Sequence, residues 1–215
     1  MIHVLGWRFY AFIILVPVVL ISALLFAIQP VQSVDEFFLL FAKSGIIVAV
    51  VTALMSNSSM FSLVSKFTPL RWLVPHIHGK WAGQVTTNYF DKAKKMGLEA
   101  KPDGAPPTSQ IAVTVEILVN LFTVTIRLES TSGYLTSETK ACQLRKAGEG
   151  GFELAYVTVN TVVHPEETDE QSFSGAGLIR FQSKSPEALR GTQWTNRNWQ
   201  KCLNTAGTIT LDRAS

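Results

Sequence analysis

Two long apolar segments near the start of the chain constrain its fold more than any other feature. Residues 9–28 contain twenty positions without a charged side chain, and residues 37–55 form a second apolar segment that contains Lys43. A helix rises 1.5 Å per residue, so twenty residues span roughly 30 Å, the thickness of a bilayer's hydrocarbon core. The sequence therefore predicts two transmembrane helices, at about 9–28 and 37–55, within a membrane region of residues 1–56.

The flanking charges predict how these helices are oriented. The first segment is too long for the apolar part of a signal peptide, no small-residue cleavage motif follows it, and a second apolar segment comes soon after. Lys66, Arg71 and Lys80 follow the second segment, whereas the connector 29–36 has only acidic charges. The positive-inside rule then places both termini in the cytoplasm.

Lys43 lies about a third of the way into the second segment. A lysine at a helix centre costs roughly 2.5–3.5 kcal/mol on insertion scales, but an off-centre lysine can extend its ammonium group to the interface. The alternative is that Lys43 lines a helix–helix contact or a pore in an assembled state.

Residues 57–75 form a connector with helical periodicity. Met60, Phe61, Val64 and Phe67 recur at helical spacing, with polar residues between them. This pattern predicts a short amphipathic helix at the membrane surface.

From Gly79 onward the hydrophobic period changes to two, which is typical of β-strands. Turn residues separate eight predicted strands, and a Lys-, Pro- and Gly-rich loop is expected at 91–109. In the third strand Phe122, Val124, Ile126 and Leu128 are predicted to point inward. The strands are expected at 81–89, 111–118, 122–128, 137–145, 152–159, 173–182, 189–196 and 207–213.

Eight short strands with no intervening helix predict an all-β domain over residues 76–215, a compact eight-stranded antiparallel up-and-down β-barrel. A β-sandwich is the alternative. Gly175 and Gly177, within the sixth strand, suit a bent barrel strand.

Alternating strand direction predicts which loops lie far from the membrane. The connections 1–2, 3–4, 5–6 and 7–8 would meet at a distal pole, which reads as a polar ligand mouth. This pole would collect Asn88, Tyr89, Ser130, Ser132, Tyr134, Ser137, Asn160, His164, Thr195, Asn196 and Arg197.

Charge and motifs exclude several function classes. Of the 19 Lys and Arg and 16 Asp and Glu residues, 15 and 14 lie in residues 76–215, so this region lacks the basic footprint of a nucleic-acid binder. The sequence contains no phosphate-binding loop or nucleophile motif, which predicts a protein that is not an enzyme and needs no cofactor.

Histidines and cysteines point to neither a metal site nor a disulfide. His76 and His78 would face one side of a strand, as two metal ligands do, but no third ligand lies nearby in the sequence, so an interfacial pair is expected. Cys142 and Cys202 are expected as free thiols in the reducing cytoplasm.

Motifs along nearly the whole chain resemble one family. These are Gly79-Lys-Trp81-Ala-Gly83, Ser132 with Ser137 and Ala141, Leu154-Ala-Tyr156, Leu189-Arg-Gly191-Thr-Gln-Trp194-Thr195-Asn-Arg197, and Gly207 to Arg213. Together with two apolar segments and eight strands, they resemble the two-transmembrane β-strand-rich effectors of bacterial CBASS antiphage systems, the CD-NTase-associated membrane effectors.

The resemblance implies a function. In this family a partner CD-NTase makes a cyclic dinucleotide on phage infection, and the effector's barrel binds it. Binding promotes homo-oligomerisation, and the transmembrane helices then disrupt the inner membrane and kill the infected cell. The resemblance thus implies a multi-pass inner-membrane protein, and the charge balance of residues 76–215 predicts no nucleic-acid partner.

Individual side chains acquire expected roles from this resemblance. Arg197 is expected to bind a phosphate of the ligand, with a solvent-exposed strand-end arginine as the alternative. Tyr156 and Trp194 are expected to stack on a base, or else to fill the barrel core. The remaining expected ligand-binding residues are polar and lie at strand ends: Thr195, Ser132, Ser137 and Asn88.

A rival interpretation comes from a different class. A membrane-tethered barrel that binds a lipid or another small apolar molecule, or that serves as an interaction scaffold, needs no second messenger. Such a barrel should have an apolar mouth, whereas the distal pole of this sequence is polar.

Overall fold

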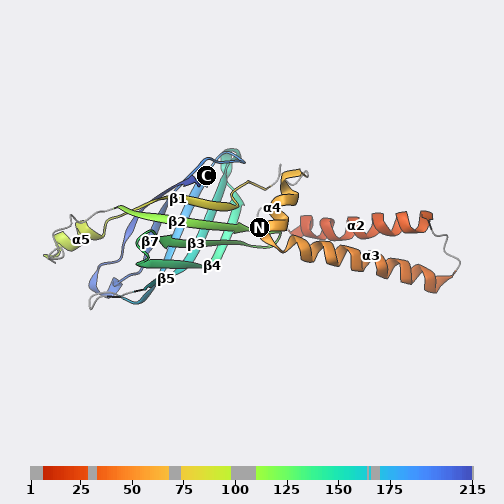
Figure 1. Cartoon of the computed structure of the whole chain (residues 1–215), viewed down its shortest axis with the longest axis horizontal. Helices are drawn as coiled ribbons and strands as arrows, with labels where there is room; N and C mark the ends of the chain where they lie inside the picture. Colours follow the sequence, from red (N-terminus) through yellow and green to blue (C-terminus); the bar gives the residue numbers. More distant parts are fainter. Residues whose placement is uncertain are drawn as a thin grey trace.

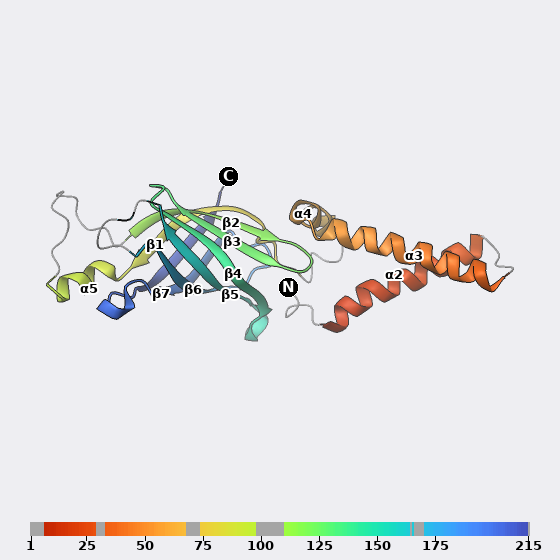
Figure 2. The same ribbon diagram turned by 90° about the horizontal axis from the view of Figure 1, so that it is seen from below.

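The structure, a computed structural model, describes residues 7–28, 33–67, 74–97, 110–163, 165 and 170–214. A helical hairpin lies at one end of the molecule and a β-barrel at the other, with a short helix between them (Figures 1 and 2). Along the chain come α2 (Trp7–Ile28), α3 (Val34–Met55) and α4 (Ser58–Phe67), followed by the strands.

Helices α2 and α3 run side by side (Figure 1). Ser33 caps α3, since its hydroxyl accepts a hydrogen bond from the Glu36 amide at 3.3 Å. Between the helices, Ser22 and Ser44 are buried and their hydroxyl oxygens lie 2.9 Å apart. Lys43 is exposed, so its side chain lies outside this helix–helix contact.

Among the described residues, one helix, α3, is long and apolar enough to cross a membrane. The apolar stretch of α2, Ile14–Ile28, is shorter. The prediction of a second membrane span therefore stays a prediction.

Eight strands close into an antiparallel barrel in which each pairs with its sequence neighbours and β1 pairs with β8. The up-and-down barrel predicted from the sequence is confirmed, and the sandwich is not. The strands are β1 (Gly79–Thr87), β2 (Gln110–Val119), β3 (Val124–Ser130), β4 (Leu135–Lys146), β5 (Phe152–Val162), β6 (Ser172–Phe181), β7 (Ala188–Thr195) and β8 (Ala206–Arg213).

Two local predictions are wrong. A helix, α5 (Tyr89–Lys95), follows β1 where the sequence predicted the start of a loop. Lys92 anchors this helix, since its ammonium donates to the carbonyl oxygen of Asn204 at 2.6 Å. Phe122 was predicted to begin the third strand and to point inward. Instead β3 begins at Val124, so Phe122 belongs to the β2–β3 turn, where it is 36% exposed.

The part of the barrel interior nearest the helices is filled by apolar side chains. Trp81 is fully buried there and its indole donates to the Ile77 carbonyl at 3.0 Å. Ile117, Leu144 and Leu154 belong to the same core, and Phe61 of α4 joins it from outside the barrel. The Leu121 amide also donates to the Met55 carbonyl at 3.2 Å, so the end of α3 is attached to the β2–β3 turn.

Candidate ligand-binding mouth

The distal end of the barrel gathers the loops that the sequence predicted. The strand order places the β1–β2, β3–β4, β5–β6 and β7–β8 connections at the end opposite the helices, where α5 lies in Figure 1. His164 was expected at this pole and lies outside the described residues.

Arg197 contacts aromatic side chains from several elements of this mouth. Its guanidinium carbon lies 5.3 Å from the centre of the Tyr89 ring and 5.6 Å from that of Phe173. Its Nη2 donates to the Tyr134 hydroxyl at 3.3 Å. Because Tyr89, Tyr134 and Phe173 come from α5, the β3–β4 turn and β6, one guanidinium connects three sides of the mouth.

The backbone around Arg197 is also held in place. The Arg197 amide donates to the Thr195 hydroxyl at 3.4 Å, and that hydroxyl lies 2.7 Å from the Thr205 hydroxyl. The β7–β8 loop that carries Arg197 is thereby closed at its base. Thr195 acts here as a positioning group for Arg197.

Asn88 has a structural role. The backbone N–H of Asn88 donates to the Ala206 carbonyl at 3.1 Å, and the side-chain Oδ1 of Asn88 accepts from the backbone N–H of Ala206 at 2.9 Å. These two bonds extend the β1–β8 pairing by one residue. The expected ligand-binding residue Asn88 thus fixes the rim of the mouth, beside Arg197's loop.

A polar layer lies inside the barrel below the mouth. Ser130, Ser137, Thr158 and Asn160 are all buried, although each carries a polar side chain. Asn160 donates to the Phe173 carbonyl at 3.4 Å, and its oxygen lies 3.5 Å from the Thr158 hydroxyl. The interior therefore changes from apolar near the helices to polar near the mouth.

The two expected serines occupy different places. Ser137 is buried opposite Asn160, in the polar layer. Ser132 is exposed in the β3–β4 turn, and its hydroxyl lies 3.3 Å from that of Ser130. Ser132 is therefore at the rim, and Ser137 lies inside.

Tyr156 forms the floor of the polar layer. It is 8% exposed, and its hydroxyl has no hydrogen-bond partner among the described residues. Burial raises the pKa of this phenol, and the neighbouring Cys142 adds to the effect. A side chain at Gly177 would collide with the Tyr156 ring, and one at Gly175 would lie 2.7 Å from the Asn160 amide nitrogen. The two glycines thus make room for Tyr156 and Asn160.

Trp194 is not part of the mouth's interior. It is 49% exposed on the outer wall, between Ala176 and Ala206 on the neighbouring strands. The alternative that Trp194 fills the barrel core is wrong, because Leu189 points inward and alternation turns Trp194 outward. Its expected stacking on a base of the ligand stays a prediction.

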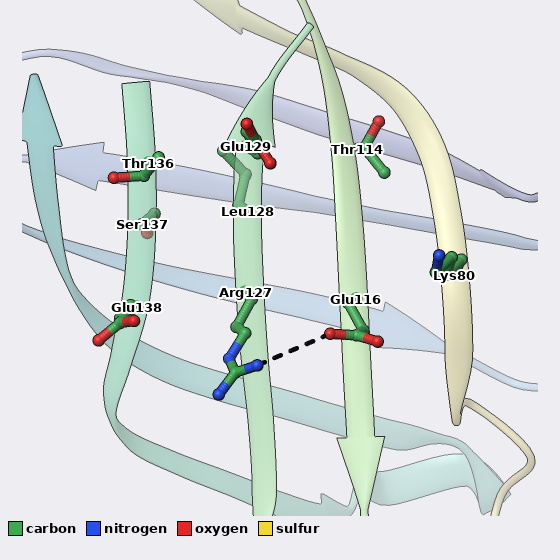
Figure 3. Close-up of a pocket in the computed structure, with 9 residues that line it drawn as sticks. All are labelled: Lys80, Thr114, Glu116, Arg127, Leu128, Glu129, Thr136, Ser137 and Glu138. Carbon is green, nitrogen blue, oxygen red and sulfur yellow. Dashed lines mark ion pairs between the residues drawn. The ribbon is translucent and has the colours of Figure 1, made fainter. Parts of the chain in front are cut away.

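A separate hollow of about 390 Å³ lies over strands β1–β4 (Figure 3). Charged side chains of both signs line it, and Arg127 and Glu116 approach to 4.0 Å. Two cationic side chains and three carboxylates line this hollow, so its positive and negative charges nearly cancel. The residues are Lys80, Thr114, Glu116, Arg127, Leu128, Glu129, Thr136, Ser137 and Glu138.

Both cysteines are free thiols. Burial raises the pKa of Cys142 to about 12, so this thiol stays protonated inside the barrel. In the described ranges no three His, Cys, Asp or Glu side chains group as metal ligands.

Sequence reasoning missed Phe173 as a site residue. The signal was present, since Phe173 is the first inward residue of β6, whose alternate residues through Phe181 point inward. It also left Tyr89 and Tyr134 outside the expected ligand-binding set, although both had been placed at the distal pole.

No known family model matches the chain. A curated protein, CD-NTase-associated protein 15 of Escherichia albertii, is 27% identical to it over 139 residues. The chain is similar to CD-NTase-associated protein 15. The match covers 65% of this chain and 62% of CD-NTase-associated protein 15, less than two-thirds of that relative's length. The similarity confirms the resemblance to CD-NTase-associated effectors, and the closed barrel with an apolar helix before it agrees with that resemblance.

Proposed function

We propose that this chain is a membrane-anchored effector of CBASS antiphage defence. Its barrel binds a cyclic dinucleotide at the distal mouth, the bound chains assemble, and the helices disrupt the inner membrane of the infected cell. The similarity to CD-NTase-associated protein 15 supports a role linked to a CD-NTase. The arrangement around Arg197 is the observation that carries the choice of ligand.

A phosphate is the first group that this mouth suits. A guanidinium offers paired hydrogen bonds that match phosphate oxygens, and it stays charged at all physiological pH values. Arg197 already lies at the mouth, with its backbone held by Thr195. A cyclic dinucleotide carries two phosphates, so one of them would replace the contact between Arg197 and Tyr134.

The rings beside Arg197 suit the bases. The centres of the Tyr89 and Phe173 rings lie 5.3 Å and 5.6 Å from the guanidinium carbon of Arg197. Stacking of a base on an aromatic ring is worth about 1–3 kcal/mol. When a phosphate draws Arg197 away, these rings become available for stacking, and the polar layer of Asn160, Thr158 and Tyr156 offers hydrogen bonds below.

Binding has to be coupled to assembly. A ligand shifts an equilibrium only through its different affinities for two states. Moving a population from 1:99 to 99:1 requires about 5.5 kcal/mol of such difference. A cluster of protomers, each with one bound ligand, supplies this difference cooperatively, which is why we propose a homo-oligomer as the active form.

The helices provide the anchor. We propose that α2 and α3 both cross the inner membrane and that both termini face the cytoplasm, where the ligand is made. The apolar α3 and the flanking basic residues support this topology. The role is one of binding and assembly, without a catalytic step.

The test is thermal unfolding of the full chain in detergent against a panel of cyclic dinucleotides. A ligand at a hundred times its Kd adds about 2.7 kcal/mol, which raises the Tm by several degrees. Arg197→Ala should abolish the shift, whereas Arg190→Ala, which removes an exposed arginine of β7, should keep it. If no cyclic dinucleotide raises the Tm but an apolar ligand does, the lipid-binding alternative replaces the proposal.

A further inference from the structure

A second hollow, of about 820 Å³, lies at the opposite end of the barrel, beside the helices. It is formed by the end of α4, the segment before β1, the β6–β7 loop and the end of β8. The residues that line it are Lys66, His76, Ser183, Lys184, Ser185, Pro186, Glu187 and Arg213. The proposed ligand mouth uses none of them.

Positive charge dominates this hollow. Lys66, Lys184 and Arg213 are cations, and Glu187 is the one acid that lines it. The ammonium groups of Lys66 and Lys184 form no ion pair with any residue that the structure describes. With neutral histidines the lining therefore carries a net charge of about +2.

The hollow is built rigidly. Arg213 donates to the carbonyl oxygens of His76 and His78, and its guanidinium carbon lies 4.5 Å from the centre of the Trp81 ring. The His76 amide donates to the Lys184 carbonyl at 2.6 Å, which fastens the β6–β7 loop to the segment before β1. An anion would thus meet cations whose backbones are already in place.

The pKa values of the two histidines reflect the positive charge around them. Burial lowers the pKa of His76, and Lys66, Arg213 and His78 lower it further. Burial also lowers the pKa of His78, with Lys66 and Arg213 opposed by Glu116. His78 Nδ1 accepts a hydrogen bond from the Val119 amide at 3.3 Å, as a neutral imidazole does.

Helix α4 places the hollow at the membrane surface. Phe61 of α4 is buried in the barrel core, whereas Met60, Leu63 and Phe67 form an exposed apolar stripe along the same helix. Helix α4 begins three residues after α3 ends, and it lies across the hairpin axis between the barrel and α3 (Figures 1 and 2). If α3 spans the bilayer, α4 and Lys66 lie at the level of the headgroups.

We propose that this hollow binds the phosphate of an anionic phospholipid headgroup. This inference rests on the membrane anchoring stated under Proposed function. Lys66 and Lys184 hold the phosphate, and Arg213 adds to the positive charge of the same hollow. The bound lipid fixes the barrel base on the bilayer, so the distal mouth points away from it.

The experiment measures phospholipid retained by the purified full chain in mild detergent, by native mass spectrometry, together with its Tm. Phosphatidylglycerol and phosphatidylcholine are offered in equal amounts. We expect wild type to retain phosphatidylglycerol at least five times better and to gain Tm from it. Lys66→Gln with Lys184→Gln should lose this preference. Lys94→Gln with Lys95→Gln, the same charge change on α5, should keep it. Arg213 is left unchanged, because its contacts hold β8 to the segment before β1.

Three results would overturn the proposal. One is an unchanged preference in the Lys66 and Lys184 variant, and another is loss of preference in the α5 variant as well. The third is equal stabilisation by millimolar inorganic phosphate, which would identify a free anion as the ligand. The same variants are also tested with cyclic dinucleotides. A cyclic dinucleotide shift that persists in the Lys66 and Lys184 variant separates failure here from failure of the proposed function.

Discussion

The guanidinium carbon of Arg197 lies 5.3 Å from the centre of the Tyr89 ring, which makes a cation–π pair across the distal mouth. Tyr89 belongs to α5 and Arg197 to the β7–β8 loop, so the pair joins two segments far apart in the sequence. In the proposed complex the ring exchanges this cation for a base.

Tyr89→Leu tests that exchange. Losing one stacked base should cost about 1–3 kcal/mol, or about five- to 150-fold in the Kd for the cyclic dinucleotide. Isothermal titration with the full chain in detergent measures this change. Trp199→Leu is the matched control, because Trp199 is 62% exposed in the same loop as Arg197. Equal losses in the two variants would contradict a stacking role for Tyr89.

Tyr156→Phe should separate stability from binding. The Tyr156 hydroxyl is buried and has no partner among the described residues, so removing it should raise the free energy of unfolding by about 1 kcal/mol. The same change removes a hydrogen bond that we expect the ligand to supply, which should weaken binding about two- to tenfold. Thermal unfolding with and without ligand measures both effects. A lower Tm without ligand would show that the hydroxyl is satisfied in the folded protein.

The strands were predictable because the alternation of apolar and polar residues is a local property of the sequence. Every β-strand formed within three residues of its predicted limits. The outward direction of Trp194 was also within reach, since Leu189 five residues earlier points inward on the same strand.

The contacts at the mouth were not predictable in the same way. The grouping of Arg197 with Tyr89, Tyr134 and Phe173 depends on strand register and loop path, which no local pattern specifies. Helix α5 was missed because a tertiary contact, from Lys92 to Asn204, holds a short lysine-rich segment in place. A helix of that length would be unstable alone.

Glu153 should make stability depend on pH in acid. Its carboxylate is buried on the outer wall beneath Arg145 and Arg180, and its Oε2 accepts from Arg180 Nε at 2.9 Å. Hydrogen bonds from Arg180 and Arg145 lower the pKa of Glu153 below its ordinary 4.5. A lowered pKa gives stability that is fully present above the unfolded pKa and is lost as the pH falls through the folded pKa.

The measurement is the Tm of wild type and Glu153→Gln between pH 7 and pH 3. At pH 7 the variant should lose about 1–3 kcal/mol, the value of hydrogen bonds to a buried charged group. The difference should shrink as the pH falls below about 4.5. Glu138→Gln, an exposed carboxylate on β4, should show no such convergence. A constant difference between wild type and Glu153→Gln across this pH range would contradict the role given to the ion pairs.

The contact between Ser22 and Ser44 allows a direct test of the hairpin in the membrane. The two hydroxyl oxygens lie 2.9 Å apart, so cysteines at these positions should be close enough for a disulfide. Ser22→Cys with Ser44→Cys, in a background where Cys142 and Cys202 are alanine, should therefore oxidise readily in inner-membrane vesicles. Ser22→Cys with Lys43→Cys is the control, because Lys43 is exposed, whereas Ser44 is buried. A protease site engineered between α2 and α3 allows the chain to be cut there after oxidation. The two fragments stay joined only if the disulfide has formed. Joined fragments in the first pair alone would support both the α2–α3 packing and the two-span anchor. Selective crosslinking at mid-helix positions requires α2 to insert beside α3.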